Sequence, residues 1–166
     1  MQAADVAAAV PGHDAVIVSL GNSQNAFALA LGARRTTPAN ICEVGTRHIV
    51  AAMQSAGVRR LVVVSAFGVG ETRPQLPFAF WLFYRTVLRE QMADKERQEV
   101  LVKSSGLDWT LVQPVALTDR PATHAWLADT GGVIRRSEVS RADLAAFLLS
   151  LLAGQGACRA TITLSG

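Results

Sequence analysis

The feature that most constrains this chain is a short apolar run at residues 61–64, LVVV, which ends at Ser65 and a glycine-spaced turn. A strand without polar positions has both faces buried, which is typical of a parallel sheet covered by helices on both sides. In open sheets of this kind, ligands bind beside the carboxyl ends of the strands. The pattern therefore predicts that Ser65 faces a ligand-binding crevice, and the alternative role for its hydroxyl is to cap the turn.

Similar apolar runs alternate with helical periods along the chain. Thr37-Pro38 suits a helix start, Gly57 suits a helix end, and Ser140 with Asp143 resembles a capping box. Alternating strands and helices predict an α/β fold with a doubly wound parallel sheet. We expect strands at residues 15–20, 61–65, 109–112 and 160–164, and helices at residues 3–10, 37–57, 78–105 and 142–152.

The composition fits one domain over residues 1–166, because half of the residues are hydrophobic and can build a substantial core. The net charge is +3, but the arginines are scattered, so we expect no nucleic-acid partner. The longest nearly apolar window, residues 144–153, is far below the roughly 20 residues of a membrane span, so we expect no membrane partner. With no targeting segment apparent, and no metal-ligand spacing among the cysteines and histidines, we expect a cytoplasmic protein without a metal site.

A glycine-rich turn normally opens a nucleotide-binding sheet, because it brings a helix N-terminus to the diphosphate. Here Gly21 stands alone after the strand at residues 15–20, and Gly68 with Gly70 lacks a third glycine and an immediate helix. The sequence therefore predicts an N-terminally truncated sheet, and a small complete sheet is the alternative. A first strand without its neighbour would have an exposed edge, through which we expect self-association.

Several segments together resemble the atypical short-chain dehydrogenase/reductases with an NAD(P)H-binding, Rossmann-like domain, a branch that includes NmrA-like proteins and the biliverdin-IXβ (flavin) reductases. The resemblance implies binding of NADPH or NADH and hydride transfer to a conjugated small-molecule acceptor such as a flavin, a bilin or a quinone. It rests on residues 2–6 (QAADV), 12–18 (GHDAVIV), 20–21 (LG), 45–53 (GTRHIVAAM), 64–67 (VSAF), 105–114 (SGLDWTLVQP) and 140–143 (SRAD).

The resemblance also implies which residues form the site. Ser65 and Lys95 would be the functional side chains, with Lys95 binding the ribose, although a solvated surface charge is the common role of such a lysine. The tyrosine of the Tyr-x-x-x-Lys pair is replaced by Gln91, so a non-catalytic, NmrA-like dinucleotide sensor or regulatory partner is the alternative function. The residues implied to border the cofactor are Leu20, Gly21, Ser65, Ala66, Phe67, Lys95, Pro114, Val115, Ala116 and Leu117.

An aromatic cluster between residues 78 and 84 stands out in a chain with only 6% aromatic residues. It could line the acceptor pocket, form a partner interface or fill the core, and core filling is the commonest role of such residues. Tyr84, eleven residues before Lys95, would share its helical face if one helix covered both. We expect Tyr84 to serve packing rather than proton transfer.

Overall fold

A computed structural model describes residues 2–22, 24, 26–155 and 157–166, and its centre is a five-stranded sheet in the order β1-β2-β3-β7-β5. The first four strands run parallel, and β5 is antiparallel to β7 at the far edge. The elements are α1 (Ala3–Ala9), β1 (Ala15–Val18), α2 (Ala26–Ala30), α3 (Ile41–Ala56), β2 (Arg60–Val64), the 3-10 helix η1 (Gly70–Gln75), α4 (Phe78–Thr86), α5 (Arg89–Ser104), β3 (Asp108–Pro114), β4 (Ala116–Thr118), β5 (Leu127–Asp129), β6 (Glu138–Ser140), α6 (Arg141–Ser150), the π-helical turn η2 (Leu151–Gln155) and β7 (Ala160–Ser165).

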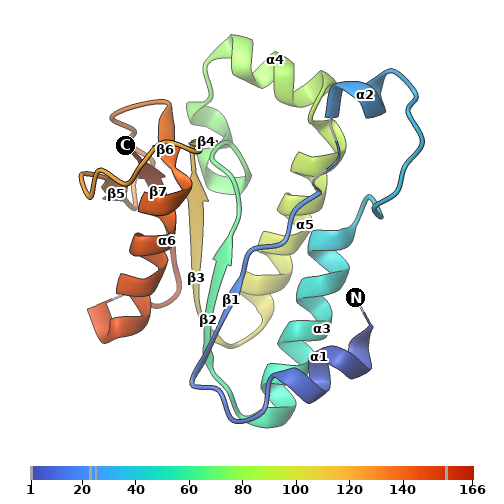
Figure 1. Cartoon of the computed structure of the whole chain (residues 1–166), viewed down its shortest axis with the longest axis vertical. Coiled ribbons are helices and arrows are strands. Elements are labelled where there is room, and N and C mark those ends of the chain that lie inside the picture. Colours follow the sequence, from blue (N-terminus) through green and yellow to red (C-terminus); the bar gives the residue numbers. More distant parts are fainter. Residues whose placement is uncertain (1, 23, 25, 156) are drawn as a thin grey trace.

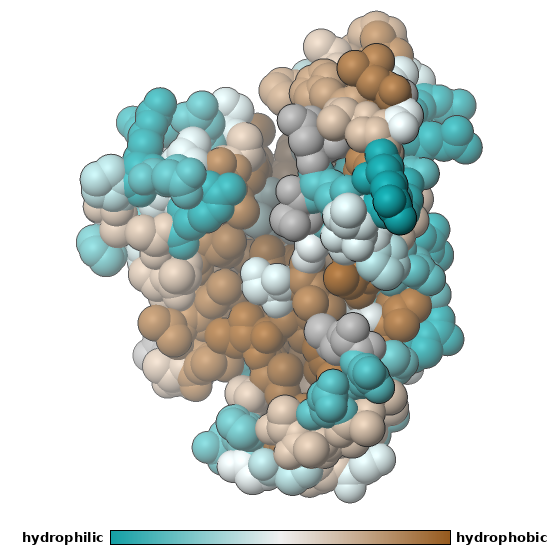
Figure 2. Space-filling model, turned by 45° about the vertical axis from the view of Figure 1, so that its right-hand side comes forward, coloured by the Kyte–Doolittle hydropathy of each residue, from teal (hydrophilic) through white to brown (hydrophobic). Residues whose placement is uncertain are grey.

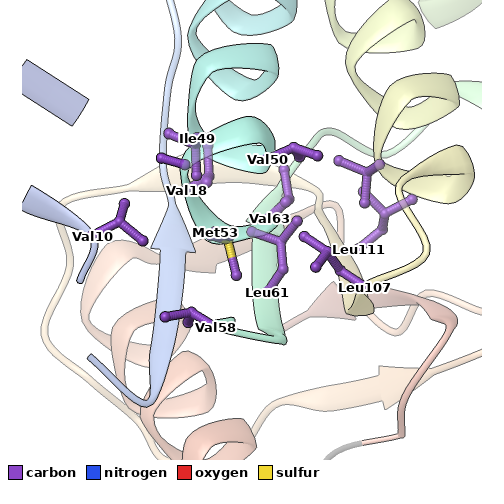
Figure 3. Close-up of a cluster of buried hydrophobic side chains, with 12 residues drawn as sticks. Val10, Val18, Ile49, Val50, Met53, Val58, Leu61, Val63, Leu107 and Leu111 are labelled. Atoms are coloured by element: carbon purple, nitrogen blue, oxygen red, sulfur yellow. The ribbon is translucent and has the colours of Figure 1, made fainter. Parts of the chain in front are cut away.

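Helices cover both faces of this sheet, with α3 and α5 on one face and α6 on the other (Figure 1). Strand β2 is buried from both sides, because Leu61 and Val63 belong to the core beneath α3 and α5, whereas Val62 and Val64 belong to the core beneath α6. Figure 3 shows the first of these cores, which Val10, the residue directly after α1, closes. The predicted α/β, doubly wound, Rossmann-like fold is confirmed, and so is the two-sided burial of the apolar run.

Two predicted helices have different boundaries in the structure. Helix α3 begins at Ile41, three residues after Pro38, and ends at Ala56, with Gly57 after it as a C-cap whose φ of 73° suits the left-handed stop of a helix. The single helix expected over residues 78–105 is wrong, because α4 ends at Thr86 and α5 begins at Arg89. The break changes the direction of the chain, so Tyr84 and Lys95 do not share a helical face.

The C-terminal third contains three short strands that the sequence did not predict. Strands β4 and β6 pair in parallel as a separate two-stranded sheet, and β5 extends the main sheet. Ser140 caps α6 as expected, since its Oγ accepts a hydrogen bond from Asp143 N at 2.9 Å. The carboxylate of Asp143 does not complete the capping box; it accepts hydrogen bonds from the backbone N–H groups of Thr123 and His124 and fixes that loop.

Strand β1 lies at the edge of the sheet. It pairs with β2, and no strand within the described ranges pairs with its other side. Ile17 in this strand is 36% exposed. The expected exposed edge is therefore present in this structure. None of the helices in the described part of the chain is both long enough and apolar enough to cross a bilayer.

Candidate functional site

The candidate site lies where β1, β2 and β3 end, at the upper end of the sheet in Figure 1. Parallel register brings Leu20, Ser65 and Val115 to this common edge, because each follows the carboxyl end of a different strand. Figure 2 shows a hollow at the same end, between a projecting part that α4 forms and a second one that the C-terminal third forms. This is the position at which an open parallel sheet binds its ligands.

Lys95 of α5 joins the ends of β1 and β2. Its Nζ donates hydrogen bonds to Leu20 O at 2.7 Å and to Val64 O at 2.6 Å. An ammonium group has three donors, so one proton remains without an acceptor among the described residues. Burial lowers the pKa of Lys95, while the neighbouring acidic groups Cys42, Asp94 and Glu99 oppose that shift. Lys95 is therefore a positioned cation at the sheet edge, and its role as a solvated surface charge is excluded.

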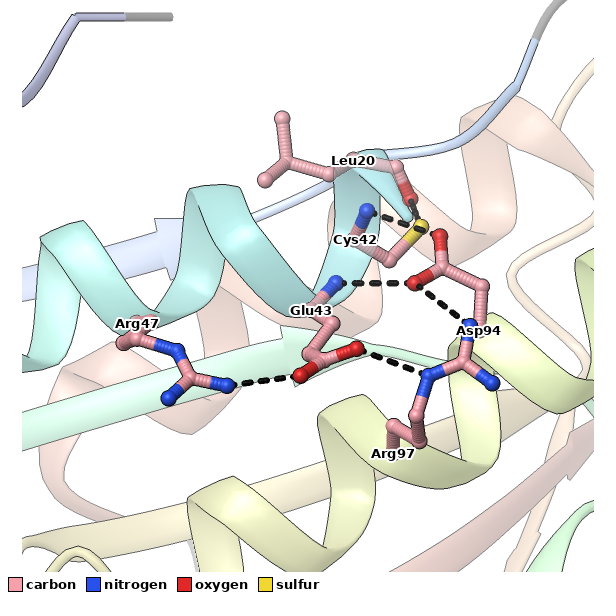
Figure 4. A network of polar contacts seen from close by, with 6 residues as sticks. All are labelled: Leu20, Cys42, Glu43, Arg47, Asp94 and Arg97. Atoms are coloured by element: carbon pink, nitrogen blue, oxygen red, sulfur yellow. Dashed lines mark hydrogen bonds and ion pairs between the residues drawn. The ribbon is translucent and has the colours of Figure 1, made fainter. Parts of the chain in front are cut away.

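The residue before Lys95 fixes α3 beside the site (Figure 4). The carboxylate of Asp94 accepts hydrogen bonds from the backbone N–H groups of Cys42 at 2.8 Å and Glu43 at 3.0 Å. A carboxylate at a helix N-terminus satisfies unpaired donors and complements the helix dipole. Burial raises the pKa of the Cys42 thiol to about 11, so the neutral Sγ–H donates to Leu20 O at 3.4 Å. Leu20 O is thus held by both Lys95 and Cys42.

Ser65 lies at the end of β2 and is only 5% exposed. Its Oγ donates to Glu99 Oε1 at 2.5 Å, and the side-chain amide of Gln113 donates to the same oxygen at 2.8 Å. The Gln113 carbonyl in turn accepts from Thr72 Oγ1 at 2.7 Å. The hydroxyl proton of Ser65 is therefore used inside the protein, and only the lone pairs of its oxygen remain to accept from a ligand. That Ser65 contacts cofactor or acceptor stays a prediction.

Glu99 is the functional candidate that sequence reasoning missed. It is 2% exposed, and burial raises its pKa, against the lowering effect of the hydrogen bonds from Ser65 and Gln113. The nearby charges of Lys103 and Glu71 act in opposite directions on it. Its Oε2 has no hydrogen-bond partner in the described part of the chain. The only signal in the sequence is that Glu99 follows Lys95 by four residues, a spacing that solvated helix faces also show.

Two of the other predicted cofactor-binding residues have buried side chains. The side chains of Phe67 and Val115 pack in the core beneath α6, so they can reach a ligand only through backbone atoms. The turns themselves lie together, because Phe67 N donates to Pro114 O at 3.0 Å. Cofactor contact by the full set stays a prediction for Leu20, Gly21, Ala66, Phe67, Pro114, Val115, Ala116 and Leu117; of these, Ala116 and Leu117 belong to β4.

The residues present fit the nicotinamide end of a dinucleotide better than its adenosine end. A Cβ at Gly21 would meet open space, and the third donor of Lys95 is free to take a ribose hydroxyl. The described residues contain no glycine-rich turn leading into a helix at the end of a strand, which is the element that binds the diphosphate. Nor do they contain a group of three or more His, Cys, Asp or Glu side chains arranged for a metal ion.

Comparison with known proteins shows the family and the fold of the chain. Residues 1–155 match the family described as NAD(P)H-binding. A short-chain dehydrogenase/reductase from Veillonella parvula has a TM-score of 0.77 at 16% identity, over 99% of this chain and 67% of that one. A V. parvula short-chain dehydrogenase/reductase in complex with NADP has a TM-score of 0.74 at 16% identity, and the match covers 100% of this chain and 69% of that one. An anaerobillin reductase from Escherichia coli O157:H7 has a TM-score of 0.72 at 22% identity, and the match covers 99% of this chain and 70% of that one. At these identities the structures share the fold, and this chain spans only 67–70% of their length.

Proposed function

Because the chain belongs to the NAD(P)H-binding family, we propose that it forms the nicotinamide and acceptor side of a reductase. The reaction would transfer hydride from NADPH or NADH to a conjugated small molecule of the flavin, quinone or bilin type. The observation that carries the proposal is the position of Lys95, a partly buried cation held at the carboxyl ends of two parallel strands with one donor to spare.

The chemistry of the proposal separates what the cofactor supplies from what the protein supplies. The reduced nicotinamide, when bound, supplies the hydride. Lys95 fixes the Leu20 and Val64 carbonyls. With its remaining proton it would donate to a ribose hydroxyl, so it would bind and orient the cofactor rather than react. Ser65 offers an acceptor oxygen, because its proton is engaged with Glu99. A flavin-type acceptor can take its proton from solvent, which agrees with Gln91 in place of a tyrosine.

The experiment is a calorimetric titration of the chain with NADPH and with NADH, compared between the wild type, Lys95→Met and Lys103→Met. Lys103 lies on the same helix and pairs with Glu71 at the surface, so its substitution is a matched control. We expect micromolar binding by the wild type, and a roughly tenfold or greater loss in Lys95→Met, since a hydrogen bond to a charged group contributes about 1.5–3 kcal/mol. Lys103→Met should bind like the wild type. Urea unfolding checks that Lys95→Met still folds.

A second assay follows NADPH oxidation with riboflavin, menadione and biliverdin as acceptors. Oxidation with one of these and binding that depends on Lys95 would together support the reductase. Binding without oxidation by any acceptor would instead favour the alternative, a non-catalytic dinucleotide sensor, which the absent tyrosine equally permits. An absence of binding by a folded wild type would refute the proposal.

A further inference from the structure

A cavity of about 180 Å³ lies against the turn that follows Ser65. Gly68 of that turn forms one part of its wall, and η1 with the residue after it, α4 and α5 form the others. Trp81 and Tyr84 contribute flat aromatic surface, and Met92 contributes a polarisable thioether. Such a lining suits a conjugated ring, which gains area on aromatic faces and sulfur.

Two arginines give this cavity a positive charge. Arg85 of α4 lies over the ring of Trp81, with its guanidinium carbon 5.3 Å from the ring centroid. Arg89, the first residue of α5, also lines the cavity. No carboxylate of the described residues is within ion-pair distance of either one. The third arginine of the lining, Arg73, is neutralised by Glu96 at 2.5 Å. The two free guanidinium groups therefore remain available to an anion beside an aromatic wall.

We propose that this cavity selects acceptors with an acidic group, a carboxylate or a phosphate, attached to a conjugated ring system. The inference rests on the proposed reductase function and names the acceptor class of the same site. Guanidinium groups suit both anions, because their planar donors match two acceptor oxygens at once. Since the cavity is smaller than the roughly 300–1,000 Å³ of a drug-sized ligand site, it takes the acidic group and the adjoining edge of the ring system, and the rest of the acceptor lies outside it.

The test compares riboflavin with FMN, which share one ring system and ribityl chain and differ by a phosphate. Binding is measured by quenching of flavin fluorescence, without added dinucleotide, for the wild type, Arg85→Ala, Arg85→Lys, Arg89→Ala and Arg136→Ala. Arg136 is an exposed arginine that lines a different surface hollow, near Asp143, so it is the control for loss of charge alone. Circular dichroism and thermal unfolding confirm that each variant is folded.

We expect the wild type to prefer FMN by roughly five- to tenfold, with the preference falling as salt is raised. Arg85→Ala and Arg89→Ala should each reduce it to about twofold or less, whereas Arg136→Ala retains most of it and Arg85→Lys, which keeps the charge but loses the paired donors, retains part of it. Equal binding of both flavins by the wild type would overturn the proposal. So would a preference that survives Arg85→Ala and is lost only in Arg89→Ala, because Arg89 also borders a neighbouring cavity of about 510 Å³ that Arg85 does not line.

This inference and the proposed function can be refuted independently of each other. If the chain discriminates FMN from riboflavin through Arg85 but does not bind NADPH, the acidic-acceptor cavity stands and the reductase proposal fails. If it binds NADPH through Lys95 but treats the two flavins alike, the reductase stands and this inference fails.

Discussion

The buried carboxyl of Glu99 makes the stability of this protein depend on pH in a direction that the structure determines. The perturbation is Glu99→Gln, an isosteric change that keeps an oxygen to accept from Ser65 and Gln113 and removes only the ability to ionise. Because burial raises the pKa of Glu99 in the folded protein, the native state keeps its proton at pH values where the unfolded chain has lost it. The variant resembles the protonated native side chain at every pH.

The sign and size follow from proton linkage. From the ordinary carboxyl value of 4.5 up to the raised pKa of the folded protein, the native state binds more protons than the unfolded state. The free energy of unfolding therefore falls as pH rises, by about 1.4 kcal/mol for each pH unit in that window. This contribution is fully present below pH 4.5 and is lost as pH passes through the folded pKa. Glu99→Gln removes the loss, so its stability relative to the wild type should increase with pH across that window and level off above it.

The assay is urea unfolding of both proteins at several pH values from 4.5 to 7.5. The control is Glu90→Gln, the same chemical change at an exposed position of α5 that pairs with Arg35. We expect the two Gln variants to diverge, with only Glu99→Gln gaining on the wild type as pH rises. Parallel stability curves for wild type and Glu99→Gln would show that Glu99 ionises normally in the fold, and would refute the reasoning from its burial.

Three further predictions concern the fold around the site. Asp94→Asn should lower the free energy of unfolding by about 1–2 kcal/mol in urea, because the N-terminus of α3 loses its charged acceptor; an unchanged midpoint would contradict the capping role. Gly57→Ala should cost about 1 kcal/mol through its positive φ alone, since a Cβ there meets open space, and thermal unfolding would measure it. We propose that the chain self-associates through β1, so sedimentation velocity should show concentration-dependent association that Ile17→Lys suppresses; a wild-type monomer at all concentrations would refute this.

The strands could be predicted because a strand that is buried on both faces requires a continuous apolar run, which is a local sequence pattern. The run before Ser65 needs apolar residues at every position, and the observed β2 ends one residue before that serine. The break between α4 and α5 could not be predicted in the same way. It falls at Val87 and Leu88, which carry no helix-breaking chemistry, so the decision belongs to packing rather than to local sequence. The pairing of β4 with β6 joins three-residue strands across a long segment that includes β5, and it too has no local signal.

The site shows the same division between local and distant causes. Ser65 was predicted from the end of the apolar run and Lys95 from the resemblance, and the structure brings both to one sheet edge through carboxyl and carbonyl partners. The role of Asp94 could not be read from the sequence, because its partners in α3 lie 51 and 52 residues away. Glu99 was missed for a related reason: a glutamate on a charged helix is ordinarily solvated, and only the tertiary packing of α5 against β2 and β3 buries it.

The packing of α5 explains why stability and function are joined in this helix. Its buried side chains are mainly polar, and they tie the helix to two neighbouring parts of the fold: Asp94 caps α3 and Gln98 donates to Thr46 of α3, whereas Glu99 accepts a hydrogen bond from Ser65 after β2. Apolar side chains would bury more surface at the same positions and would avoid the cost of desolvating a carboxyl. They would also pack in more than one register, whereas hydrogen bonds of fixed geometry allow only one. The polar face therefore holds α5 at the rotation and height that place Lys95 between the ends of β1 and β2, which is the arrangement that the proposed function needs.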